Sequence, residues 1–191
     1  MTNAVVRWPR LWPVFRPLMR RQFDRIAPVW DSFRMEDTLA PYKAALGRIT
    51  EPVERALDVG TGTGAGARAI REQFPAADVV GVDVSPRMIA EARKLVPEAT
   101  FVEGDASELP FDDESFDLAA HSNMIPFLEQ TARVLRPGGW TLFAFSSGAE
   151  TPIWVEPDRL RRELERRGFT DFAEISAGRG VAVVARRPAP N

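Results

Sequence analysis

Three aspartates stand at the ends of short apolar segments and could together bind a nucleoside: Asp58, Asp83 and Asp105. At the end of a second strand, a carboxylate such as Asp83 accepts both hydroxyl groups of a ribose. Asp105 stands beside a small residue, Ala106, which suits the amino group and the adjacent ring nitrogen of adenine. Asp58 would repel a pyrophosphate and favours a cationic group. The three side chains therefore indicate a site for an adenosine compound that carries a positive charge.

A glycine-rich turn, DVGTGTG over residues 58–64, follows the first apolar segment directly. Glycine tolerates positive φ and lets backbone N–H groups approach a ligand without a Cβ in the way. The turn also fits a dinucleotide-binding loop, because Gly62, Gly64 and Ala67 keep its spacing and Asp83 follows Gly62 by 21 residues. The glycines alone therefore leave nicotinamide dinucleotides and other adenosine ligands open.

The composition excludes several other kinds of site. The 191 residues contain no cysteine and one histidine, so thiol nucleophiles and Cys-rich or multi-His metal sites are ruled out, and no metal is expected. The net charge of −2 offers no general attraction for nucleic acid. The single histidine, His121, is a candidate general base, because its ordinary pKa is about 6.5 and it ends a predicted strand.

The elements that must position these residues follow a βαβ pattern from residue 55 onward. Strands are expected at 56–59, 79–84, 100–102, 117–121 and 140–145, with helices ending near Phe74 and spanning 86–95, 124–135 and 157–167. Two last strands, 172–177 and 180–186, form an antiparallel hairpin through a glycine-containing turn. The predicted fold is α/β, a Rossmann-like three-layer sandwich with a mostly parallel seven-stranded sheet. Ligands of such sheets bind beyond the carboxyl ends of the strands, where the three aspartates stand.

Four motifs carry a resemblance to a known family: ALDVGTGTG (56–64), VVGVDVSPRMIAEAR (79–93), EGDASELPFDDESFDL (103–118) and RVLRPGGWTLF (133–143). FDRIAPVWD (23–31) resembles a stretch upstream of the same family's core. The sequence looks like a class I S-adenosylmethionine-dependent methyltransferase of the small-molecule type, most similar to the ubiquinone/menaquinone C-methyltransferases. The resemblance implies S-adenosylmethionine as the cofactor and residues 51–191 as the domain that binds it.

The resemblance also implies a role for each part of the cofactor site. The glycine loop would wrap the methionyl part, oriented by Asp58, while Asp83 holds the ribose and Asp105 contacts the adenine edge. Val84 and Met88 would lie against adenine, and the end of the fourth strand near the amino acid part. The implied cofactor residues are Asp58, Gly60, Thr61, Gly62, Gly64, Asp83, Val84, Met88, Gly104, Asp105, Ala106, His121 and Ser122.

Residues 1–50 are expected to form an arm and helices that cover the acceptor. Prolines recur at every fourth position from Pro9 to Pro17, so this stretch is expected to be extended, with helices over 18–27 and 35–49. Its aromatic residues provide surface for a flat or apolar acceptor: Trp8, Trp12, Trp30 and Tyr42. Arginines beside tryptophans are also typical of a peripheral membrane contact. Packing on the domain or in a homodimer is favoured over it, because the prolines disrupt any amphipathic helix.

The implied activity is methyl transfer to a small, apolar or aromatic acceptor by in-line displacement. Two alternatives remain open. A non-catalytic S-adenosylmethionine-binding module is favoured by the lack of a clear base, and an NAD(P)-dependent reductase is disfavoured by the charge of Asp58. Asn123 to Phe127 keeps only part of the Asn-Pro-Pro-aromatic motif of nucleic-acid amino-methyltransferases, so nucleic acid is not expected as a partner. The sequence has no apolar run of signal-peptide or membrane-span type, and a cytoplasmic location is expected.

Overall fold

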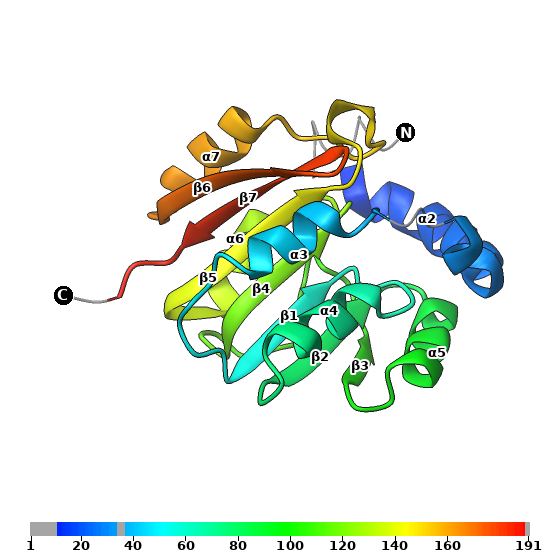
Figure 1. Cartoon of the computed structure of the whole chain (residues 1–191). Helices are drawn as coiled ribbons and strands as arrows, with labels where there is room; N and C mark the ends of the chain where they lie inside the picture. Colours follow the sequence, from blue (N-terminus) through cyan, green and yellow to red (C-terminus); the bar gives the residue numbers. More distant parts are fainter. Residues whose placement is uncertain (1–10, 34–36, 190–191) are drawn as a thin grey trace.

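One sheet dominates the part of the chain that the computed structural model describes, residues 11–33 and 37–189 (Figure 1). Its seven strands lie in the order β3-β2-β1-β4-β5-β7-β6 within these ranges. The strands are β1 Arg55–Val59, β2 Asp78–Asp83, β3 Thr100–Glu103, β4 Phe116–Ser122, β5 Leu135–Phe145, β6 Thr170–Ala177 and β7 Gly180–Arg186. The pairs from β3 to β5 are parallel, while β7 pairs antiparallel with β5 and β6. The predicted fold class, with its C-terminal hairpin, is confirmed.

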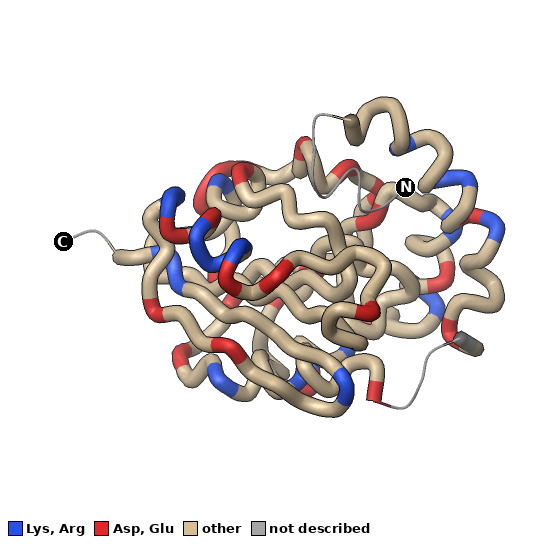
Figure 2. Tube along the Cα trace, turned by 90° about the horizontal axis from the view of Figure 1, so that it is seen from above, with Lys and Arg blue, Asp and Glu red and all other residues tan. Residues whose placement is uncertain are grey.

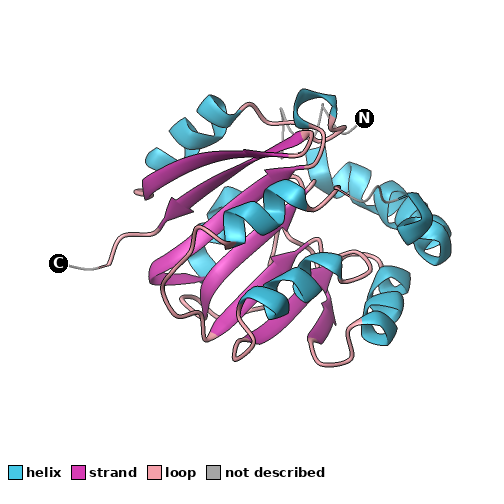
Figure 3. Cartoon of the chain, viewed as in Figure 1, coloured by secondary structure: helices cyan, strands magenta, loops and turns pink. Residues whose placement is uncertain are grey.

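Helices cover both faces of this sheet (Figure 3). They are α2 Trp12–Ile26, η2 Ala27–Phe33, α3 Ala40–Leu46, α4 Ala65–Gln73, α5 Pro86–Leu95, α6 Leu128–Val134, η3 Gly148–Glu150 and α7 Pro157–Glu165. Alternate residues of β1 point to opposite faces: Ala56 joins a core with Tyr42 and Ile70, and Leu57 joins one with Val80. The central strands are therefore buried on both faces, as in other parallel sheets, whereas the edge strand β6 is partly exposed.

Helix α2 corrects the prediction of an extended, proline-broken arm. It begins at Trp12 and continues through Pro17 to Ile26. Pro13 lies in the first turn, where the N–H groups have no partner within the helix, so only Pro17 removes a helical hydrogen bond. The apolar residues Trp12 and Met19 are buried against the domain, and this packing outweighs that loss.

Further boundaries differ from those expected, including the start of β5, which lies at Leu135 rather than at 140. The helix expected over 35–49 is the shorter α3, and residues 34–36 lie outside the described ranges. Helix α6 begins at Leu128 rather than at 124, because Asn123 adopts a φ of 50° and bonds Ser146 instead of capping a helix. The side chain of Asn123 thereby links the end of β4 to the end of β5.

Acidic and basic residues are interspersed along the chain (Figure 2). On α7, Arg161 pairs with Glu165 and Arg166 with Glu163, so this arginine-rich helix presents a mixed, solvated face. In the described ranges, every helix is too short or too polar to cross a bilayer.

Candidate functional site

The glycine turn lies at the carboxyl end of β1 and is fastened to β2. Gly60 and Thr61 donate their N–H groups to the carbonyl oxygen of Val82, at 2.8 and 3.0 Å. Gly60, Gly62 and Gly64 have φ values of 68°, 54° and 88°. A side chain at any of them would be strained, so the turn needs glycine at these three positions.

Asp83 lies at the end of β2 and faces the glycine turn. Its Oδ2 accepts the N–H of Gly62 at 2.9 Å, and its Oδ1 accepts the N–H of Ser85 at 2.9 Å. Burial raises the pKa of Asp83, and the two backbone donors oppose this shift. A carboxylate oxygen has about two lone-pair sites, so each oxygen can still accept a hydroxyl hydrogen. The geometry therefore fits two ribose hydroxyl groups.

Asp58 is buried beneath the turn and is satisfied by its own chain. Its Oδ1 accepts the Tyr42 hydroxyl hydrogen at 2.8 Å, and its Oδ2 accepts that of Thr61 at 2.6 Å. The N–H of Ala67 at the start of α4 also bonds it. Burial raises the pKa of Asp58 to about 6. The carboxylate of Asp58 is thus occupied by groups of its own chain, and it stabilises the turn above it.

Asp105 follows β3, and helix α2 contacts it from above. Its Oδ1 accepts the indole N–H of Trp12 and the backbone N–H of Ser107, both at 2.8 Å. Its Oδ2 accepts from the Arg16 guanidinium at 2.9 Å. Burial by itself would raise the pKa of Asp105, but these hydrogen bonds outweigh it and lower the pKa. The acid expected at the adenine edge is therefore ionised and in contact with α2.

The remaining predicted cofactor residues surround these acids. Gly104 donates its N–H to the carbonyl oxygen of Asp83 at 2.9 Å, and Met88 donates its N–H to Ser85 Oγ at 3.1 Å. Met88 and Ala106 are buried, while Val84 and Ser122 are half-buried. The strand ends thus bring these predicted cofactor residues to one edge of the sheet.

His121 lies in the core instead of at an open strand end. Its ring stacks on Phe143 at 4.1 Å between centroids, and Nδ1 lies 3.1 Å from the Leu142 carbonyl oxygen. Nε2 lies 3.2 Å from the Thr131 hydroxyl. Burial lowers the pKa of His121 to about 4. Both ring nitrogens are engaged inside the protein, which is the environment of a structural histidine and disfavours a role as a general base.

Two of the four predicted covering aromatics lie over the site. Trp12 contacts Asp105, and a Cβ placed on Gly62 would lie 3.6 Å from Trp30 Nε1. Tyr42 has no exposed surface, so it is a core residue and its prediction as part of a substrate cover is wrong. Trp8 lies outside the described residues.

Sequence reasoning assigned no structural contact to several residues at the site. Asp24 accepts the Ser85 hydroxyl hydrogen at 2.6 Å, and Asp31 accepts that of Thr63 at 2.8 Å, so both acids fasten α2 and η2 to the site. A Cβ placed on Gly60 would lie 2.6 Å from the sulfur of Met124. The FDRIAPVWD stretch contains both acids, but its motif gave no indication of which groups they contact.

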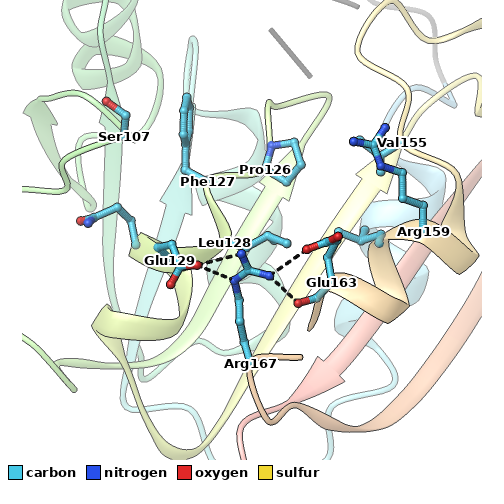
Figure 4. Close-up of a pocket in the computed structure, with 11 residues that line it drawn as sticks. Ser107, Pro126, Phe127, Leu128, Glu129, Val155, Arg159, Glu163 and Arg167 are labelled. Carbon is cyan, nitrogen blue, oxygen red and sulfur yellow. Dashed lines mark hydrogen bonds and ion pairs between the residues drawn. The ribbon is translucent and has the colours of Figure 1, made fainter. Parts of the chain in front are cut away.

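A separate pocket of about 400 Å³ lies between α6 and α7 (Figure 4). Phe127, Leu128 and Val155 line it with apolar surface, and Arg167 bridges Glu129 and Glu163 at its rim. Phe127 also contacts Trp12 edge-on, at 5.6 Å between ring centroids. The pocket therefore adjoins the end of α2 that covers Asp105.

Comparison with known proteins gives the same family as the motifs. Residues 56–139 match the methyltransferase domain family. Demethylmenaquinone methyltransferase of Chlorobaculum tepidum is 36% identical over 140 residues, which cover 65% of this chain and 57% of the relative. Phthiotriol/phenolphthiotriol dimycocerosates methyltransferase 1 of Mycobacterium ulcerans is 31% identical over 162 residues, covering 71% and 60%. The chain thus spans less than two thirds of the length of these curated relatives.

Solved structures share the fold. A chain in the complex between the Haloferax volcanii Trm112 methyltransferase activator and the putative methyltransferase has a TM-score of 0.73 at 24% identity, covering 87% of this chain and 97% of that one. An S-adenosylmethionine-dependent methyltransferase from Aquifex aeolicus has a TM-score of 0.66 at 19% identity, covering 78% and 91%. Motifs, sheet topology and relatives agree, and residues 56–139 match a methyltransferase domain of the class I S-adenosylmethionine-dependent type.

Proposed function

We propose that this chain transfers a methyl group from S-adenosylmethionine to a small, apolar or aromatic acceptor by in-line displacement. The observation that carries the proposal is the position of Asp83 opposite the glycine turn, with lone pairs left for a ribose. When bound, S-adenosylmethionine supplies an electrophilic methyl group on its sulfonium. Asp83 holds the ribose, Asp105 and the Ala106 N–H meet the adenine edge, and Asp58 keeps the turn in shape around the methionyl part.

The chain's own contribution to the transfer is alignment and the exclusion of water. An acceptor atom must be held about 3–3.5 Å from the methyl carbon, in line with the bond that breaks. Trp30 and Met124 approach the glycine turn and provide apolar surface for this purpose. No proton transfer is assigned to His121, because both its ring nitrogens are engaged in the core. A proton lost by the acceptor passes to solvent in this mechanism.

The names of the relatives support an apolar acceptor. They include methyltransferases of demethylmenaquinone and of phthiotriol dimycocerosates, together with a fatty-acid O-methyltransferase of Mycolicibacterium smegmatis. Phe23 and Trp30 meet edge-on, at 5.9 Å between ring centroids, and add aromatic surface near the turn. A quinol, a phenol or a long-chain acid is the acceptor class to test first.

The outer side of α2 supports a peripheral membrane contact as a source of such acceptors. Val14 and Leu18 are 74% and 47% exposed on one side of the helix, and Arg21 and Arg25 are exposed further along it. Apolar and basic residues together favour an anionic bilayer surface. The wild type should sediment together with anionic vesicles. Leu18→Glu should abolish this co-sedimentation, and Leu95→Glu should not. Equal sedimentation of both variants, or a doubled mass in solution without vesicle binding, would favour a homodimer instead.

A turnover assay tests the proposed activity. The protein is incubated with methyl-labelled S-adenosylmethionine and a panel of quinols, phenols and fatty acids, and the label is followed into the organic phase. The proposal expects label in at least one acceptor and formation of S-adenosylhomocysteine in equal amount. Cofactor binding without turnover across the panel would favour the non-catalytic binding module. Binding of NAD(P) in place of S-adenosylmethionine would favour the reductase.

A further inference from the structure

Helix α2 contacts Asp105, which the proposed function assigns to the cofactor, and Ser85, which bonds the other assigned acid, Asp83. Its N-terminal half reaches Asp105 through Trp12 and Arg16, at 2.8 and 2.9 Å. Its C-terminal half reaches the Ser85 hydroxyl through Asp24, at 2.6 Å. The helix therefore runs across the carboxyl ends of β2 and β3, with polar contacts at both of its ends.

The contacts at Asp105 leave little room for another donor. Oδ1 already accepts two hydrogens, from Trp12 and from the Ser107 N–H, which fill its lone-pair sites. Oδ2 accepts from Arg16, and only 14% of the Asp105 side chain is exposed. An adenine amino group therefore meets at most one free lone-pair site, on Oδ2, of a carboxylate that Trp12 and Arg16 largely cover.

The two contacts differ in strength. Trp12 is 4% exposed and meets Phe127 edge-on, so its ring is held by packing as well as by the hydrogen bond. Arg16 is 49% exposed, so its ion pair with Asp105 contributes little in water. Trp12 is thus the main part of the closed arrangement, and Arg16 adds to it.

From this geometry we propose that the N-terminal half of α2 is a latch on the cofactor site, in which Trp12 and Arg16 compete with adenine for Asp105. The proposal rests on the proposed cofactor role of Asp105. Closing the latch fills the adenine edge in the absence of cofactor, and binding of the cofactor requires that Trp12 and Arg16 leave it. Only molecules with an open latch bind the cofactor, so the apparent Kd equals the Kd of the open form divided by the fraction of molecules that are open.

Titration calorimetry with S-adenosylhomocysteine tests the competition. Trp12→Phe keeps an aromatic ring but removes the indole donor, and Arg16→Ala removes the guanidinium. Each variant should bind more tightly than the wild type, and the double variant should lower the Kd by about fivefold or more, with faster association. The matched control is Arg21→Ala, which removes an exposed arginine from the same helix and should leave the Kd unchanged.

The possible results separate the latch from the proposed function. Equal Kd values in all variants would overturn the latch and leave the cofactor site intact. Weaker binding by Trp12→Phe or Arg16→Ala would also overturn it, because these side chains would then belong to the occupied pocket. An absence of binding in every folded variant, the wild type included, would overturn the proposed function itself.

A second measurement uses the unaltered chain and does not depend on the folding of any variant. Amide hydrogen exchange is followed across residues 16–20 of α2, with and without saturating S-adenosylhomocysteine. The latch predicts faster exchange in the presence of the ligand, because the N-terminal half of the helix loses its contacts. Slower exchange would show that the ligand stabilises the contacts of α2 with the domain, which contradicts the latch.

Discussion

Asp58 shows how one buried carboxylate can hold a glycine turn in shape through hydrogen bonds within its own chain. It holds the Tyr42 hydroxyl, the Thr61 hydroxyl and the start of α4, at 2% exposure. The sequence placed this residue in the glycine motif and predicted that it favours a cationic group and orients the methionyl part of the cofactor, mostly without direct contact. The motif could not identify the partner Tyr42, because it lies 16 residues away, on helix α3.

The raised pKa of Asp58 gives a prediction at the scale of this residue. Burial raises the pKa from 3.8 to about 6 in the folded state, so folding is favoured by the protonated form. The stability of the wild type relative to Asp58→Asn should therefore be greatest below about pH 4 and decline as the pH rises to about 6. The expected total decline is on the order of 3 kcal/mol. Denaturant unfolding of both proteins between pH 4 and 8 measures it, and a difference that is constant with pH would contradict the prediction.

At the scale of the elements, glycine decides how closely α4 approaches β1. A Cβ placed on Gly66 would lie 2.5 and 2.6 Å from the two carboxylate oxygens of Asp58. The sequence predicted helix α4 well, because its apolar spacing is regular, but gave no sign that Gly66 has to be glycine. Such a close approach depends on a tertiary contact that no local pattern records.

Replacement of Gly66 should therefore separate local helix preference from packing. Gly66→Ala should lower the free energy of unfolding by about 1–3 kcal/mol, although alanine favours the helix, because the methyl group collides with Asp58. The control is Gly47→Ala at the end of α3, where φ is −64° and the nearest atoms to an added Cβ lie at 3.6 Å. This second variant should be neutral or slightly stabilising. Equal effects of the two substitutions in denaturant unfolding would count against the close packing of α4 on Asp58.

Helix α2 marks the limit of local reasoning about elements. Its prolines predicted an extended arm, yet the helix continues through Pro17 because Trp12 and Met19 gain burial against the domain. The strands of the main sheet were predicted closely, since a parallel sheet buried on both faces leaves short apolar runs in the sequence. The covering elements follow no such rule, so their contacts with Asp105 and Ser85 emerge only in the structure.

At the scale of the whole molecule, the order of the strands brings together residues that are distant in sequence. The order in which successive strands are added to the sheet reverses between the neighbours β1 and β4. Ligands bind at such a topological switch point. The three aspartates named from the sequence lie at β1, β2 and after β3, on the carboxyl side of neighbouring strands. The position of the site could therefore be predicted from the fold class, whereas the closure of α2 over it could not.

The central claim is that this edge of the sheet binds S-adenosylmethionine through Asp83. Titration calorimetry with the cofactor tests it most directly, using Asp83→Ala and Asp78→Ala. These aspartates stand at opposite ends of the same strand, and Asp78 pairs with Arg55 away from the site. We predict saturable binding by the wild type, binding at least about tenfold weaker after Asp83→Ala, which corresponds to about 1.4 kcal/mol, and no change after Asp78→Ala. Equal binding by the wild type and Asp83→Ala would contradict the account.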